Sequence, residues 1–269
     1  MNTVYLAEPF QTLWTGQDPF AAVECLQGSI LRALEGRRTL RVEVAGHGYF
    51  VKIHRGIGWR EIFKNLFSLR LPVLGARNEW QALQRLHEHH IDTMRAVAYG
   101  ERGRDPATKH SFLITEELAP TISLEDFCRH WKSNPPPPAL KRRLIRRVAE
   151  MTGAMHRGGV NHRDLYICHF LLHLPPSDEP KLSLIDLHRA QVRNRTPHRW
   201  RNKDLAALLF SSHDIGLTRR DHLRFLRAYF ARPLRDILRR ERVLLDWLPV
   251  EARRLHARYL RRYAPETGA

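Results

Sequence analysis

Two stretches in the second half of the chain decide the fold: GVNHRDLYICHFLL at residues 159–172 and LSLIDLHRA at residues 182–190. The first places an acidic residue, Asp164, in a tight loop after a helical pattern. Two short strand patterns, ICHFLL and LSLIDL, then bracket the turn HLPPSDEP, and a second acidic residue, Asp186, ends the second strand. A loop carboxylate, a hairpin and a strand-end carboxylate in this order are typical of phosphoryl-transfer sites.

The same stretches resemble two motifs of the protein kinases. Residues 162–165 match the catalytic-loop sequence HRDL, in which the aspartate is the catalytic base. Asp186 stands where the magnesium-binding aspartate of Asp-Phe-Gly is expected, although Leu187 and His188 replace Phe and Gly. An HRD triplet arises easily in a chain rich in arginine and histidine, so the interpretation depends on the neighbouring segments.

The segment 28–54 contains three strand patterns, SILRALE, TLRVEVA and YFVKIH, separated by GRR and AGHG, and predicts a three-stranded antiparallel meander. Lys52 lies in the middle of the third strand, like the lysine of VAIK that contacts the α and β phosphates of ATP. Glu79 begins the helical pattern NEWQALQRLHEHH and is its expected ion-pair partner. Glu61 competes for this role, and Arg85 is an alternative partner for Glu79.

Two further segments are candidates for nucleotide binding. The connection between the first two strands occupies the position of the glycine-rich loop, but it has one glycine instead of three. We expect Gly36, Arg37 and Arg38 to meet phosphate oxygens there. The stretch HSFLITEEL resembles the strand and hinge on which adenine rests. The groups expected to offer backbone hydrogen bonds are those of Glu116, Glu117 and Leu118.

The whole pattern predicts an α+β, bilobal protein-kinase-like fold. Residues 1–118 form the predicted nucleotide-binding lobe, an antiparallel sheet with one main helix and an amphipathic insertion at about 56–76. Residues 119–269 form the predicted helical lobe, which carries the catalytic loop and the metal-binding aspartate. Within it, Ser123 is a candidate N-cap, NPPPP at 134–138 is an extended spacer, and helices follow from Arg201 onward.

The amino-acid composition excludes some classes of protein and indicates which kinds of partner to expect. With 43% hydrophobic residues in 269, the chain has enough apolar mass for a core, which excludes intrinsic disorder. The net charge of +17 comes mostly from arginine and predicts anionic partners. The cysteines are three, far apart and in no CxxC pair, which predicts a reducing compartment and no zinc finger. We find no signal peptide or apolar run of spanning length, and expect a cytoplasmic protein, soluble or peripheral.

The order and context of these segments resemble the bacterial lipopolysaccharide core heptose kinases, a branch of the protein-kinase-like fold. The resemblance extends from about Gly28 to Tyr229 and is carried by GRRTLRVEV, YFVKIH, NEWQAL, HRDLYICHFLL, LSLIDLHRA and NKDLAALL. It implies phosphorylation, dependent on ATP and Mg²⁺, of O-4 of heptose I in the lipopolysaccharide inner core. The implied location is cytoplasmic, peripheral to the inner membrane. The expected partners are the lipopolysaccharide core and lipid A acceptor, the anionic inner-membrane leaflet, and a small acidic protein such as an acyl carrier protein.

The resemblance also implies roles for individual residues. Asp164 would orient the sugar hydroxyl and accept its proton, while Arg163 would brace the catalytic loop. Asp186 would bind Mg²⁺, and His169 is a second candidate metal ligand because it stands where an Mg-binding asparagine is usual. Asp204 is expected to open the buried helix beneath the catalytic loop and to give structural support there, with a simple N-cap as the alternative.

Other interpretations stay open at this point. A protein kinase is disfavoured because only a short segment separates Asp186 from Asp204, which leaves little room for a peptide platform. A basic, non-catalytic binding module is disfavoured because Lys52, Asp164 and Asp186 are all present. Nucleic acid is not an expected partner, since no recognised binding motif occurs. The cluster HEHH at 87–90 is interpreted as a solvated helix end rather than a metal site, and the insertion either joins the core or lies at a membrane surface.

Overall fold

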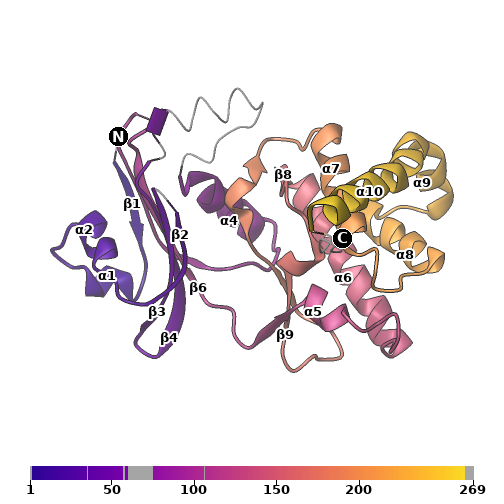
Figure 1. The fold of residues 1–269 in the computed structure, drawn as a ribbon, viewed down its shortest axis with the longest axis horizontal. Coiled ribbons are helices and arrows are strands. Elements are labelled where there is room, and N and C mark those ends of the chain that lie inside the picture. Colours follow the sequence, from indigo (N-terminus) through magenta and orange to yellow (C-terminus); the bar gives the residue numbers. More distant parts are fainter. Residues whose placement is uncertain (1, 35, 57, 60–74, 106, 264–269) are drawn as a thin grey trace, which may run out of the picture. The chain divides into compact units, whose positions relative to one another are not determined.

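The structure is a computed structural model that describes residues 2–34, 36–56, 58–59, 75–105 and 107–263. The chain divides into two compact units (Figure 1). Unit 1 contains Met1–Gln84, Thr93–Leu118 and Asp186–Arg189, and unit 2 contains Arg85–Asp92, Ala119–Ile185 and Ala190–Ala269. Asp186 therefore groups with the sheet-bearing unit, whereas the sequence placed it in the helical lobe.

Unit 1 is built on a six-stranded sheet in which every neighbouring pair is antiparallel. In spatial order its strands are β1 (Thr3–Leu6), β5 (Ala96–Arg102), β6 (His110–Glu116), β4 (His47–His54), β3 (Arg37–Val44) and β2 (Ser29–Leu34). The predicted meander is confirmed as β2, β3 and β4, and the two further predicted strands as β5 and β6. The edge strand β1 was missed by the sequence analysis.

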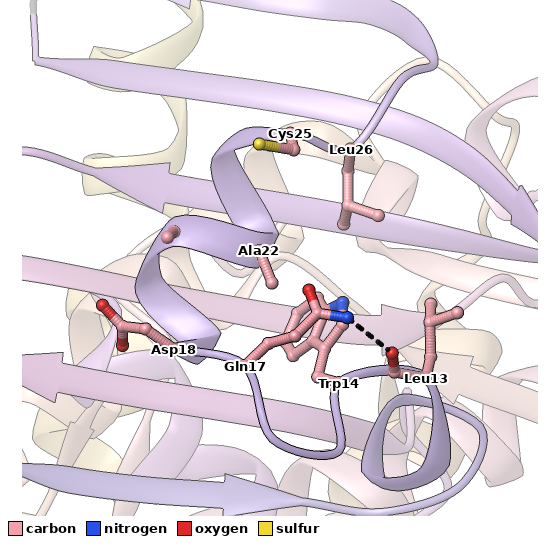
Figure 2. A pocket seen from close by; sticks show the side chains of 8 residues that line it. Leu13, Trp14, Gln17, Asp18, Ala22, Cys25 and Leu26 are labelled. Carbon is pink, nitrogen blue, oxygen red and sulfur yellow. Dashed lines mark hydrogen bonds between the residues drawn. The ribbon is translucent and has the colours of Figure 1, made fainter.

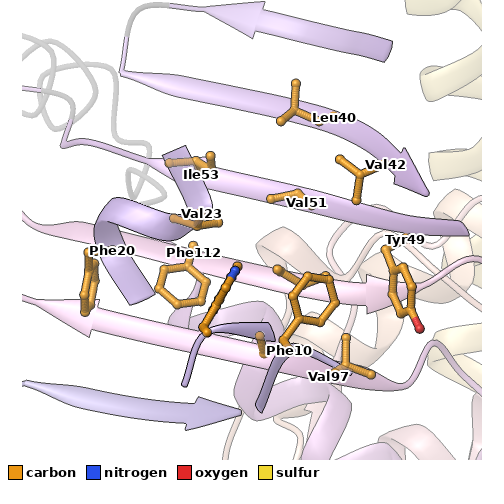
Figure 3. Close-up of a cluster of buried hydrophobic side chains, with 13 residues drawn as sticks. Phe10, Phe20, Val23, Leu40, Val42, Tyr49, Val51, Ile53, Val97 and Phe112 are labelled. Carbon is orange, nitrogen blue, oxygen red and sulfur yellow. The ribbon is translucent and has the colours of Figure 1, made fainter. Parts of the chain in front are cut away.

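One face of this sheet is covered by two short helices, α1 (Phe10–Leu13) and α2 (Pro19–Glu24). Phe10 and Phe20 from these helices pack with Val51 and Phe112 of the sheet in a buried apolar cluster (Figure 3). The Asp18 side chain caps α2 by accepting the N–H of Phe20. Because strand side chains alternate between faces, the burial of Val51 and its partners on this face directs the intervening residues of β4 to the other face.

That other face carries the helix α4 (Arg77–Glu88), which confirms the predicted helix. Its Trp80 stacks on Tyr99 of β5, with ring centroids 4.9 Å apart and an interplanar angle of 5°. Ala82 and Leu83 are fully buried, as their spacing predicts for the apolar side of an amphipathic helix. Glu79, one turn into α4, is consequently held close to the sheet.

Unit 2 is mostly helical, as predicted. Its helices are α5 (Leu124–Cys128), α6 (Pro138–Arg157), α7 (His198–Ser211), α8 (Arg219–Phe230), α9 (Leu234–Arg240) and α10 (Arg242–Tyr263). Its small sheets are β10 (Leu182–Leu184), β9 (Phe170–His173) and β7 (Thr121–Ser123), and separately β11 (Gln191–Val192) and β8 (Val160–Asn161). An apolar cluster joins α6, α7, α8 and α10 through Ala149, Leu205, Tyr229 and Leu244.

Several local predictions can be compared with these elements. Ser123 caps α5 by accepting the N–H of Asp126 at 3.0 Å, as predicted. Pro138 already belongs to the first turn of α6, because a proline at this position loses no helical hydrogen bond, so the spacer is shorter than predicted. Residues 167–169 form a 3₁₀ turn, η1 (Ile167–His169), and the strand begins only at Phe170. Most of the insertion predicted at 56–76, with Glu61, lies outside the described residues.

Candidate phosphoryl-transfer site

Unit 1 holds Lys52 and Glu79 in a buried ion pair. Lys52 Nζ donates to Glu79 Oε1 at 2.6 Å, and the two side chains are 14% and 2% exposed. The pair follows from the fold, since the alternation of β4 turns Lys52 toward the face that α4 covers. The contact expected from the sequence is present. Arg85, the alternative partner of Glu79, instead pairs with Glu88 at 3.0 Å and donates to the Gly158 carbonyl.

Two arginines of β3 add positive charge to unit 1. Burial lowers the pKa of Arg37, while Glu79 and Asp186 act in the opposite direction, which places this guanidinium within electrostatic reach of both carboxylates. Among the described residues, the buried Nε atoms of Arg37 and Arg38 have no hydrogen-bond acceptor. Buried N–H groups are costly when unpaired, so these two fit an oxygen-rich ligand such as a phosphate chain.

A neutral histidine lies among these cations. Burial, together with the nearby positive charges of Arg37 and Lys52, lowers the pKa of His54 to about 3. His54 is therefore uncharged near neutral pH and adds no charge to this part of unit 1.

Asp186 adopts a left-handed backbone conformation, with φ of 61°. Its Oδ1 accepts a hydrogen bond of 2.6 Å from Nδ1 of His188, two residues later. A carboxylate that is about one-third exposed is a suitable oxygen ligand for Mg²⁺. The histidine that replaces the glycine of Asp-Phe-Gly therefore orients the carboxylate from within the same turn.

Unit 2 holds the catalytic loop through one buried carboxylate. Asp204 Oδ2 accepts the main-chain N–H of His162 at 2.7 Å, and Oδ1 accepts that of Arg163 at 2.8 Å. Asp204 lies in the middle of α7, which begins at His198, so the expectations that it opens or caps the helix are wrong. It supports the loop from beneath, and Arg163 takes a φ of 74° there.

A second buried layer fixes Asp204. His156 of α6 places Nε2 at 3.2 Å from Asp204 Oδ2 and Nδ1 at 2.7 Å from the Tyr229 hydroxyl. Burial raises the pKa of Tyr229, so its hydroxyl stays protonated and can donate a hydrogen bond to the Nδ1 lone pair of the tautomer in which Nε2 carries the proton. His156 then donates through Nε2 to Asp204. The sequence analysis missed His156, and the available signal was a polar residue at helical spacing from the apolar residue Val148 and from Thr152.

Asp164 and His169 are joined within the loop. The Asp164 carbonyl accepts the Tyr166 N–H at 2.9 Å and a hydrogen bond of 2.7 Å from His169 Nδ1. Nδ1 therefore carries the proton in this contact, and Nε2 has the lone pair when the ring is neutral. That tautomer is typical of metal-bound histidines. The ring of His169 also stacks on His162, at 5.4 Å between centroids.

Part of the predicted hinge segment, at Glu117, is hydrogen-bonded to the neighbouring strand β4. The Glu117 N–H donates to the Gly48 carbonyl at 2.9 Å, so this N–H does not face adenine. The Glu117 carboxylate binds Arg41 through two nitrogens, at 2.9 and 2.7 Å. Backbone binding of adenine by Leu118 stays a prediction. Gly36 has a φ of 70°, a value that favours glycine, and its carbonyl accepts the Arg55 N–H.

Other candidate sites are formed by other residues. A cavity of about 310 Å³ in unit 1 is lined by α1, α2 and the residues between them, including Trp14, Asp18 and Cys25, and by no predicted site residue (Figure 2). The His87–His90 cluster is exposed at the end of α4, as a solvated helix end should be. Within the described residues, the group with metal-ligand spacing is instead His213, Asp214 and His256.

Comparisons with known proteins agree with the motifs. A family model described as "Lipopolysaccharide kinase (Kdo/WaaP) family" matches residues 21–229. The lipopolysaccharide core heptose(I) kinase WaaP of Pseudomonas aeruginosa is 66% identical over 256 residues, which cover 94% of this chain and 96% of that protein. The protein of the same name in Escherichia coli K12 is 55% identical over 262 residues, covering 96% and 99%.

A solved structure described as WaaP in complex with acyl carrier protein has a TM-score of 0.84 and 61% sequence identity, covering 94% of this chain and 99% of that one. The predicted kinase-like fold is thereby confirmed. Membership of a kinase family implies ATP as the phosphate donor. The matched region contains the meander, the catalytic loop and Asp204. This chain belongs to the lipopolysaccharide kinase (Kdo/WaaP) family.

Proposed function

We propose that this protein transfers the γ-phosphoryl group of ATP to O-4 of heptose I in the lipopolysaccharide inner core. The observation that carries the proposal is the buried pair of Lys52 and Glu79, because a lysine fixed in this way is poised to bind phosphates rather than to serve as a surface charge. The names of the two relatives support heptose I as the acceptor. The position O-4 rests on the resemblance alone.

In this proposal unit 1 binds the nucleotide. Lys52, held by Glu79, contacts the α and β phosphates, and Arg37 and Arg38 donate to the remaining phosphate oxygens. Asp186 is the first ligand of Mg²⁺, with His169 as the second candidate. When bound, Mg²⁺ neutralises charge that develops on the phosphate oxygens.

Unit 2 supplies the catalytic base. Asp164 orients the sugar hydroxyl and accepts its proton as the hydroxyl oxygen bonds to the γ-phosphorus and the bond to the bridging oxygen of ADP breaks. Arg163 braces the loop, and its N–H is already fixed by Asp204. The division of labour between two lobes, at about residue 118, is part of the proposal and is supported by the two compact units.

The proposed partners are anionic. A related structure is described as a complex with acyl carrier protein, and we propose a small acidic protein of this class as a partner here. The net charge of +17 favours such a partner and an anionic membrane leaflet. Near its end, helix α10 presents exposed Tyr259 and Leu260 in the same stretch as a hollow lined by Glu251, Arg254, Arg258 and Arg261, and this combination of apolar and mainly basic residues suits a membrane surface. No helix in the described part of the chain is long and apolar enough to cross a bilayer.

The test is a phosphate-transfer assay on three acceptors with the purified protein, ATP and Mg²⁺. These are core glycolipid that lacks the heptose phosphate, the same glycolipid already phosphorylated at O-4 of heptose I, and a mixture of peptides. We expect transfer to the first acceptor only, with the new phosphate located at O-4 by NMR. Transfer to peptides, or to the O-4-phosphorylated glycolipid, would contradict the proposal.

A further inference from the structure

Three cationic side chains surround one indole in unit 2. From the ring centroid of Trp200, Lys203 Nζ lies at 4.9 Å, Arg199 Cζ at 5.5 Å and Arg163 Cζ at 5.8 Å. Trp200 is half-buried, whereas Arg199 and Lys203 are exposed. We call Trp200, Arg163, Arg199 and Lys203 the Trp200 platform. All three distances fall within the range of cation–π contacts.

The fold places this platform beside the catalytic loop. Trp200 and Asp204 are four residues apart on α7 and therefore lie on the same side of the helix. Asp204 accepts the N–H of Arg163, so that side faces the loop. Arg163 is both the residue before Asp164 and a member of the platform. A ligand held on the platform thus lies next to the proposed base.

Two exposed cations of the platform, Arg199 and Lys203, are available to an external anion. Among the residues that the structure describes, neither Arg199 nor Lys203 forms an ion pair with an acidic side chain. By contrast, Arg201, on another side of α7, pairs with Glu241 at 3.0 Å. Cations gathered around one ring repel each other, and an anion bound among them offsets that repulsion.

The ligand is better matched to the acceptor than to the nucleotide. The groups that fit the phosphates of ATP are Lys52, Arg37 and Arg38 of unit 1. The platform instead follows the segment after Asp186, which in protein kinases positions the peptide substrate. Exposed cations within 6 Å of the centre of a flat apolar ring suit a sugar that carries a negative charge.

We propose that the Trp200 platform binds an anionic sugar of the acceptor, with a carboxylate or phosphate among the three cations and the sugar ring packed on the indole. This inference rests on the proposed function, because it assigns an acceptor site to the same enzyme. Arg199, Trp200 and Lys203 would set the affinity for the acceptor and leave the nucleotide site unchanged.

The test compares three variants with the native full-length chain in steady-state kinetics. They are Trp200→Ala, the double variant Arg199→Ala with Lys203→Ala, and a matched control, Arg232→Ala with Arg235→Ala, which removes the same charge from exposed positions. We expect the first two to raise KM for the core acceptor about tenfold, with KM for ATP unchanged. The double variant, at exposed positions, should also keep the native unfolding midpoint. Trp200→Phe, which keeps an aromatic ring, should recover most of the affinity. The control should match the native chain.

Modified acceptors identify the anionic group. One modified acceptor has its sugar carboxylate converted to a neutral group. If the platform binds this carboxylate, the modification should raise KM for the native chain to the value of the double variant, and KM of the double variant should be the same for the modified and the unmodified acceptor. If the platform binds a lipid phosphate, an acceptor that lacks this phosphate should show the raised KM with the native chain, and the acceptor with the modified carboxylate should not. An unchanged KM in both platform variants, or an equal rise in the control, would overturn the inference.

A separate outcome tests the proposed function. If the native chain transfers no phosphate to the acceptor, the proposed function is wrong. The inference about the Trp200 platform is then tested by binding alone, with calorimetry of the core oligosaccharide on the native chain and on the double variant. Equal binding by the native chain and the double variant would then overturn it.

Discussion

The carboxylate of Asp204 accepts the main-chain N–H of Arg163 at 2.8 Å, so a residue in the middle of α7 holds the loop that carries Asp164. The same carboxylate accepts the N–H of His162 and contacts His156, and it is almost fully buried. Because the acceptor is a charged group with no solvent around it, its removal leaves buried N–H groups without a partner. The geometry of the catalytic loop therefore depends on one side chain forty residues downstream in the sequence.

The first prediction concerns this side chain. Asp204→Ala should lower the free energy of unfolding by about 2 to 5 kcal/mol, since two buried N–H groups lose a charged acceptor. It should also lower kcat, because Asp164 is no longer held in place. Urea denaturation and steady-state kinetics measure the two effects. Asp236→Ala, on the partly exposed surface of α9, is the control and should change stability by less than about 1 kcal/mol. A native-like kcat in Asp204→Ala would show that the loop does not need this anchor.

The second prediction concerns the ion pair of unit 1. Glu79→Ala leaves the ammonium of Lys52 buried and unpaired, and should destabilise the protein by roughly 3 to 5 kcal/mol. The other single variant is Lys52→Met. The double variant Lys52→Met with Glu79→Ala removes both charges, so it should be more stable than Glu79→Ala while remaining inactive. Thermal unfolding of both single variants and the double variant completes the cycle. If the two single effects simply add, the pair is not coupled as the 2.6 Å contact implies.

The third prediction concerns the base. Asp164→Asn keeps the shape of the side chain but cannot accept the proton, and should lower kcat by roughly 10²- to 10⁴-fold. KM for ATP and the unfolding midpoint should stay close to the native values. Asp178→Asn, which neutralises a highly exposed carboxylate, serves as the control. A kcat within a few-fold of native in Asp164→Asn would remove this residue from the proposed role.

The fourth prediction concerns pH and His54. Burial lowers the pKa of His54 to about 3 in the folded protein, against about 6.5 in an unfolded chain. Between these values the unfolded state binds more protons than the folded state, so the free energy of unfolding rises with pH and falls as pH drops below about 6.5. One such group contributes a slope of up to about 1.4 kcal/mol per pH unit.

The measurement is urea denaturation between about pH 6.5 and 4. His54→Gln should show a shallower loss of stability than the native chain, because glutamine does not titrate. His47→Gln, at an exposed position, should follow the native curve. Identical slopes for the native chain and His54→Gln would mean that His54 does not stay neutral in the folded state.

Local patterns in the sequence determined much of this protein. The strand pattern YFVKIH was enough to place Lys52 in the middle of β4, and the helical pattern NEWQALQRL was enough to predict α4. The motif HRDL identified the loop of Asp164, and the excess of arginine indicated anionic partners. These features follow from residues that are close together in the chain, and their periods are visible without a structure.

Tertiary structure alone decided which distant residues meet. It gave Glu79 to Lys52 rather than to the alternative partner Arg85, assigned Asp204 to the loop amides rather than to a helix cap, and placed Trp200 beside Arg163. The short helices α1 and α2 were missed because four to six residues do not establish a helical period. The physical reason is the same throughout: period and propensity are local properties of the chain, whereas the partner of a buried charge is set by packing between segments that the sequence keeps far apart.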